Sequence, residues 1–200
     1  MGYFTGGILG TGFLMAAMRN SAFVMNYGLG MSIASIGLIF GMMFTNYQTN
    51  PTLKTMLYAS FVGCTAASLT PMIHAYGSAV LFDAALCTGA TMGGLGMVAW
   101  NAPSEQFLKM GGALSLGLGA LLGVGLLQMF YPYSAALYNL NMYGGIALFS
   151  MFVLYDTQKI MMKAKQQQHF DPVQNAMCVY LDAINLFVRF AAIMGQGKRK

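Results

Sequence analysis

The stretch M-Y-G-G-I-A-L-F-S-M-F-V-L-Y-D-T-Q-K-I, from Met142 to Ile160, is an apolar run of helical length with one carboxylate inside it, at Asp156. A second run, D-P-V-Q-N-A-M-C-V-Y-L-D-A-I-N-L-F from Asp171 to Phe187, starts after a polar link and carries Asp182 in its interior. An α-helix needs about 20 mainly apolar residues to cross a lipid bilayer. The two runs therefore predict a pair of transmembrane helices, each with an aspartate at membrane depth.

The rest of the chain has the same character, because 57% of its 200 residues are hydrophobic and only 8% are charged. So few charges cannot cover the surface of a water-soluble globular domain. Seven crossings of about 20 residues would use roughly 140 positions and leave too few for a separate soluble domain. We expect one integral membrane domain over residues 1–200, surrounded by the lipid bilayer.

Seven apolar segments follow one another, separated by short polar or proline-containing breaks. Backbone groups in lipid must be hydrogen-bonded within each segment, so the pattern predicts an all-α, polytopic bundle of seven transmembrane helices. Asn50 and Asp171 each precede a proline, as an N-cap precedes proline in the first helical turn, and Ser104 is expected to cap the fifth helix. The expected helices cover about residues 3–18, 28–45, 52–73, 78–100, 104–130, 141–162 and 173–194.

Charged side chains at membrane depth are costly and therefore indicate functional positions. Four such residues stand out: Asp83, Asp156, Asp182 and Arg189. Lys109, Lys159 and Lys163 lie near helix ends, where their long side chains can reach water. Asp83 lies only a turn or two into its helix, which favours a carboxylate at the membrane interface. Asp156 and Asp182 instead lie equally far from His169, in the middle of the link between the sixth and seventh helices. In an antiparallel hairpin, both carboxylates would lie at equal depth, close to the bilayer midplane.

Helical rotation groups the polar residues of both helices into stripes. The seventh helix carries Cys178, Asp182, Asn185 and Arg189 on one stripe, and the sixth carries Asp156, Lys159 and Lys163. Because polar stripes are unfavourable in lipid, we expect them to face each other or a water-filled cavity.

Two facing carboxylates cannot both ionise at low cost, so one should keep a proton while the pair attracts a cation. Ca²⁺ takes about six to eight oxygen ligands, and backbone carbonyls, water and the side chains of Tyr155, Thr157 and Asn185 could approach such a set around the two aspartates. The residues predict an ion or proton site at Asp156 and Asp182, with Tyr155, Asn185 and Arg189 in support. The alternative is structural: each aspartate pairs with a cation, for instance Asp182 with Arg189, and fixes the bundle.

Other functional classes find little support in the residues. Tyr155 and Asp156 match the Y-D half of the intramembrane aspartyl protease signature, but the G-x-G-D half is missing before Asp182. No G-x-S-x-G occurs, and His74 and His169 both lie in predicted loops. The cations are scattered or at helix ends, which argues against a nucleic-acid surface. We therefore expect no enzyme activity, no resident cofactor and no nucleic-acid partner.

The sequence around the two aspartates resembles the transmembrane Bax inhibitor motif family. The specific motifs are L-Y-D-T-Q from Leu154 to Gln158 and Y-L-D-A-I-N-L-F from Tyr180 to Phe187, while A-P-S-E-Q-F-L-K-M-G at residues 102–111 is similar to the family's mitochondrial branch. The resemblance implies a seven-helix bundle with the last helix central. It also implies that Asp156 and Asp182 form a pH-sensitive gate for calcium leak or calcium/proton exchange.

The same resemblance implies a multi-pass protein of the mitochondrial inner membrane with roles in cristae organisation and apoptosis control. One feature departs from the family pattern. In family members an arginine of the second helix can latch onto the sixth-helix aspartate, whereas residues 28–45 contain no Arg, Lys or His. The closed-state latch would then be missing or supplied by another residue. This departure leaves open an alternative, a non-transporting structural subunit of a larger inner-membrane protein complex.

Overall fold

The computed structural model describes residues 2–103, 106–166 and 170–197, and these residues form α-helices and one short 3-10 turn, with no strand among them. The all-α class predicted from the sequence is therefore confirmed for the described part of the chain. The helices form two compact units, Met1–Leu81 with His169–Tyr180, and Phe82–Gln168 with Leu181–Lys200. The last helix contributes its first turns to the first unit and its remainder to the second.

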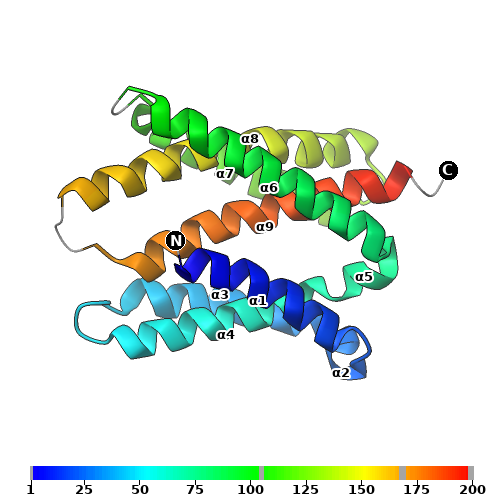
Figure 1. The fold of residues 1–200 in the computed structure, drawn as a ribbon. Coiled ribbons are helices and arrows are strands. Elements are labelled where there is room, and N and C mark those ends of the chain that lie inside the picture. Colours follow the sequence, from blue (N-terminus) through cyan, green and yellow to red (C-terminus); the bar gives the residue numbers. More distant parts are fainter. Residues whose placement is uncertain (1, 104–105, 167–169, 198–200) are drawn as a thin grey trace. The chain divides into compact units, whose positions relative to one another are not determined.

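The first unit is built around helix α4. Its helices are α1 (Gly2–Met18), α2 (Ala22–Asn26), α3 (Gly28–Phe44), α4 (Pro51–Leu69), α5 (Pro71–Tyr76) and the start of α9 (Pro172–Gly197). Figure 1 shows α3 and α4 as a helical hairpin with α1 beside α4, and α4 contacts both of these helices.

Aromatic rings fill the core of this first unit. Tyr180 is fully buried, and its ring centre lies 5.5 Å from that of Phe61 and 6.2 Å from that of Tyr58. The Tyr180 hydroxyl is hydrogen-bonded to Thr11 Oγ1 of α1 at 2.7 Å. Gly7 allows α1 to approach closely, because a Cβ at that position would collide with the Tyr58 hydroxyl.

The second unit contains most of α6 (Ser78–Asn101), the 3-10 turn η1 (Leu108–Met110), α7 (Gly111–Phe130), α8 (Ala135–Gln166) and the remainder of α9. Helix α7 packs along α8. A buried apolar cluster of Phe149 and Val153 from α8 with Leu186 from α9 joins these two helices, and Leu118 of α7 packs against it. This cluster fixes the helices that carry the two predicted site aspartates.

Three helices differ from the ranges expected from the sequence. The third segment is interrupted after Leu69, because Pro71 begins the separate helix α5. The fifth segment becomes a regular helix only at Gly111, after the 3-10 turn, and the predicted cap Ser104 lies outside the described residues. The sixth helix is longer than the expected 141–162, since it runs over Ala135–Gln166.

Five helical stretches of the described residues are long and apolar enough to cross a membrane: Pro51–Tyr76, Ser78–Asn101, Leu108–Phe130, Ala135–Gln166 and Pro172–Gly197. Two shorter apolar helices, Gly2–Met18 and Gly30–Phe44, complete the seven segments seen in the sequence. Large apolar side chains such as Phe13, Leu116 and Met129 are exposed on the helix surfaces, as expected for lipid contact. That all seven segments cross the membrane stays a prediction.

Candidate functional site

The two aspartates singled out by the sequence lie on neighbouring elements of the second unit. Asp156 projects from α8 and Asp182 from α9, and only 7% and 4% of their surfaces are exposed. The two carboxyl groups are close enough to interact electrostatically. The structure therefore brings together the pair that was predicted from equal spacing around the interhelical link.

Asp182 has an incomplete set of partners. Its Oδ2 atom is buried and has no hydrogen-bond donor in the described part of the chain. A buried carboxylate oxygen without a donor costs free energy unless it carries a proton or contacts a cation. The Asp182 side chain therefore has an open position for one of these two species.

The surroundings of Asp156 differ, because cations follow it on the same helix. Lys159 and Lys163, one and two turns later, both interact electrostatically with the Asp156 carboxyl group. The Lys159 ammonium also lies 5.2 Å from the centre of the Tyr155 ring. The pair is thus asymmetric, with positive charge near Asp156 and an open position at Asp182.

Tyr155, predicted as a supporting oxygen ligand, lies against helix α7. A Cβ at Gly111 would lie 2.9 Å from the Tyr155 ring and 3.0 Å from its hydroxyl oxygen, so the glycine makes room for this side chain. The Tyr155 ring also meets Phe152 edge-on, with the ring centres 6.5 Å apart. In this structure Tyr155 therefore packs α8 onto α7.

Asn185 and Arg189, the other two predicted supporting residues, bind each other. The Arg189 guanidinium donates from Nη1 to Asn185 O at 3.0 Å and to Asn185 Oδ1 at 3.1 Å. It also donates from Nε to Asn141 O at 3.3 Å and from Nη2 to Asn141 Oδ1 at 3.4 Å. No acidic side chain of the described residues lies within ion-pair distance of Arg189. The contact between Asp182 and Arg189 that the structural alternative assumed is therefore not formed here.

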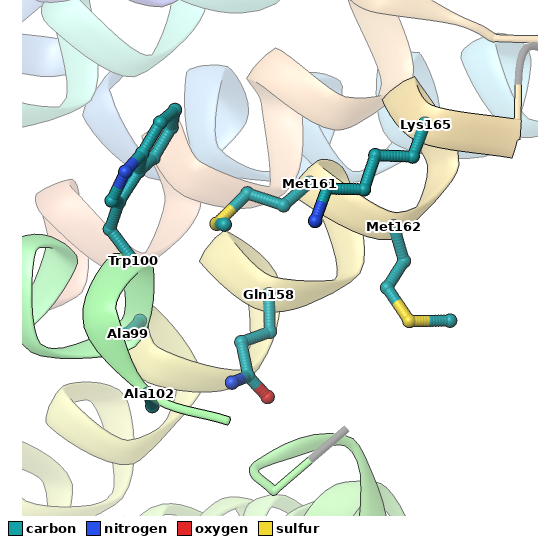
Figure 2. Close-up of a pocket in the computed structure, with 7 residues that line it drawn as sticks. All are labelled: Ala99, Trp100, Ala102, Gln158, Met161, Met162 and Lys165. Carbon is teal, nitrogen blue, oxygen red and sulfur yellow. The ribbon is translucent and has the colours of Figure 1, made fainter. Parts of the chain in front are cut away.

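Gln158 is a buried polar residue that the sequence analysis did not single out. Only 4% of it is exposed, and its Oε1 accepts a hydrogen bond from Phe107 N at 2.8 Å while its Nε2 donates to Pro103 O at 3.1 Å. Figure 2 shows the Gln158 side chain pointing from α8 toward the end of α6, where Ala102 lies. Both residues line a cavity of about 80 Å³. Gln158, two residues after Asp156, thus holds the connection between α6 and α7. Its place at the end of the L-Y-D-T-Q motif was the sequence feature that could have identified Gln158 as a functional residue.

A buried ion pair in the first unit was also missed. Lys54 is 3% exposed, and its ammonium donates to Asp171 Oδ2 at 2.6 Å and to Thr45 O at 2.8 Å. Asp171 also caps α9 as predicted, because its Oδ1 accepts from Gln174 N at 2.9 Å. Asn50 stands at the N-cap of α4 without a side-chain hydrogen bond. Lys54 therefore ties the end of α3 and the start of α9 to α4, beside an open cavity of about 470 Å³.

Asp83 and His74 are the other two residues that the sequence brought into consideration. Asp83 is exposed on α6, and its position at the membrane interface stays a prediction. The His74 Nε2 atom is 2.7 Å from Arg19 O, which places the imidazole in a contact between helix ends. Among the described residues no three His, Cys, Asp or Glu side chains cluster as metal ligands. A Ca²⁺ ion at the aspartate pair would therefore take its other ligands from uncharged oxygens.

Comparison with known proteins covers almost the whole chain. A family model described as "Inhibitor of apoptosis-promoting Bax1" matches residues 1–199. The chain is 35% identical to the growth hormone-inducible transmembrane protein of Rattus norvegicus over 99% of its own length, and it spans 62% of that protein. It is 27% identical to Bax inhibitor 1 of Drosophila melanogaster over 93% of the chain and 77% of the relative. Protein lifeguard 4 of Mus musculus is 28% identical over 84% of the chain and 68% of the relative.

Proposed function

The chain belongs to the Bax inhibitor family of multi-pass membrane proteins, and we propose that its Asp156/Asp182 pair moves Ca²⁺ or H⁺ across the membrane as a pH-sensitive calcium leak or calcium/proton exchanger. One observation carries the proposal. Asp182 has a buried carboxylate oxygen without a donor in the described part of the chain, next to a second buried carboxyl group. That arrangement supports a site that a cation and a proton occupy in turn.

The competition between the two occupants gives the site its pH dependence. When one carboxyl group holds a proton, the pair has one negative charge and attracts a divalent cation weakly. When that proton leaves, the charge doubles, and Ca²⁺ binds more tightly at the cost of releasing the proton. Acidification therefore empties the site of Ca²⁺. Protons that move down a pH gradient across the membrane then drive Ca²⁺ in the opposite direction.

Ca²⁺ flux into proteoliposomes under an imposed pH gradient tests this function. The native chain is compared with Asp156→Asn and Asp182→Asn, which remove one ionisable carboxyl group each and keep the side-chain size. Asp83→Asn is the matched control, because it is the same substitution at an exposed carboxylate on α6. We expect a pH-dependent Ca²⁺ flux in the native chain and the control, and its loss in both site variants.

A folded native chain that passes no more Ca²⁺ than empty liposomes would overturn the proposal. Co-purification with a partner at fixed stoichiometry, together with an absence of flux, would instead favour the structural subunit of a larger complex. Seven crossing helices in one domain remain a prediction from the apolar segments of the sequence. The inner mitochondrial membrane and roles in cristae organisation and apoptosis control remain predictions that rest on the family resemblance. Fractionation of cells that produce the full-length protein tests the location.

A further inference from the structure

Arg189, predicted from the sequence to support the aspartate site, is a buried cation whose part in transport is not explained by the exchange of a proton for Ca²⁺. It is 8% exposed, and its four hydrogen bonds within the described residues all go to neutral oxygens of Asn141 and Asn185. A guanidinium at membrane depth is costly and is retained where it serves a function. Because these partners are neutral, the positive charge of Arg189 can act electrostatically on charged groups farther away.

Helix α8 provides a fitted position for this guanidinium. Asn141, Gly145 and Phe149 follow each other at intervals of four residues, which places them on one face of the helix. A Cβ at Gly145 would collide with Arg189 Nε, and the guanidinium carbon lies 4.9 Å from the centre of the Phe149 ring. The hydrogen bonds, the ring and the missing Cβ together fix the position of the charge.

The fixed charge is carried two helical turns from Asp182 on the same helix. Arg189 follows Asp182 by seven residues on α9, so the Cα atoms of the two residues lie about 20° apart around the helix and about 10 Å apart along it. The guanidinium reaches back to Asn185, which lies between them. Electrostatic interaction over about 10 Å remains substantial when water is largely excluded.

We propose that Arg189 is a specificity-determining residue of the Asp156/Asp182 site, where its fixed positive charge lowers the preference for divalent over monovalent cations. This inference rests on the proposed function. At an effective dielectric constant of about 20, a unit charge about 10 Å away changes the affinity for a monovalent cation roughly tenfold, and that for a divalent cation roughly a hundredfold. Arg189 would therefore keep Ca²⁺ binding weak enough for release.

Three substitutions separate the charge of Arg189 from its hydrogen bonds. Arg189→Met removes both the charge and the hydrogen bonds. Arg189→Lys keeps the charge and loses the planar guanidinium group with its paired N–H donors. Arg189→Gln removes the charge and keeps a hydrogen-bonding group. Ca²⁺ affinity and its competition by K⁺ are measured on each folded chain in lipid nanodiscs. We expect both neutral variants to bind Ca²⁺ at least tenfold more tightly and to prefer Ca²⁺ over K⁺ roughly tenfold more. Arg189→Lys should stay close to the native chain.

The outcomes distinguish this inference from the function on which it rests. If the native chain, Arg189→Lys and the neutral variants all show the same preference for Ca²⁺ over K⁺, and Asp182→Asn still abolishes Ca²⁺ binding, the role of Arg189 is overturned and the proposed function stands. Absence of Ca²⁺ binding in the native chain, or binding that Asp182→Asn leaves unchanged, would overturn both. If Arg189→Met does not fold, Arg189→Gln gives the decisive comparison, because its amide can still bond Asn141 or Asn185.

Discussion

Replacing Lys54 by Met removes a buried ammonium and leaves the length of the side chain almost unchanged. The Lys54 ammonium donates to Asp171 Oδ2 at 2.6 Å and to Thr45 O at 2.8 Å. Removing one partner of a buried ion pair typically costs about 3–5 kcal/mol. The Asp171 side chain is 24% exposed, so water solvates part of the charge left behind. We therefore expect Lys54→Met to lower the free energy of unfolding by about 3 kcal/mol.

A double-mutant cycle isolates the ion pair from the other contacts of Lys54. Asp171→Asn keeps a good N-cap for α9 and removes only the charge. We expect a coupling free energy of about 2 kcal/mol between the two substitutions. Unfolding is followed by far-ultraviolet circular dichroism during titration of dodecyl sulfate into lipid-detergent micelles.

Lys165→Met is the matched control, because this lysine is exposed near the end of α8. Its effect should stay within about 0.5 kcal/mol, as for most surface substitutions. A loss below about 1 kcal/mol for Lys54→Met, or a coupling free energy near zero, would refute the account of this ion pair as a stabilising junction of three helices.

Three further substitutions test individual contacts. Gly145→Ala should destabilise the protein by about 1–3 kcal/mol, because the new Cβ displaces Arg189 from its fitted position, and the midpoint of the dodecyl sulfate titration measures the loss. Gln158→Leu should cost about 2–3 kcal/mol by leaving two backbone groups of the α6–α7 connection unpaired, and limited proteolysis should cut that connection faster than in the native chain. Tyr180→Phe should cost about 1 kcal/mol through loss of the hydrogen bond to Thr11, measured by the same titration, with unchanged helix content.

The sequence predicted the aspartate pair because charge in an apolar segment is a strong signal. Asp156 and Asp182 interrupt runs that lipid would otherwise surround, and their equal spacing from the interhelical link placed them at one depth. The structure puts both side chains in the interior of the second unit. Depth along a helix follows from the constant rise per residue, so residue counting can predict it, and the equal depth of the two carboxyl groups in the membrane stays a prediction.

The hydrogen-bond and ion-pair partners of the polar and charged residues could not be predicted by counting residues along one helix. Lys54 and Asp171 are 117 positions apart, and Gln158 and Phe107 are 51 apart, so their contacts depend on how distant helices pack. Helical periodicity placed Arg189 on the face of Asp182, but which oxygens it binds depends on Asn141, 48 positions away. A helical wheel gives the face of a residue and carries no information on the neighbouring helix.

The number of protons released when Ca²⁺ binds tests the aspartate pair most directly. The purified chain in nanodiscs is titrated with Ca²⁺ in weakly buffered solution at neutral pH, and the pH change gives the protons released per bound ion. Two facing carboxyl groups that share one proton predict a release of about one proton per Ca²⁺, and its loss in Asp156→Asn and Asp182→Asn. Ca²⁺ binding without proton release, or with the same release in both variants, would contradict exchange at this pair.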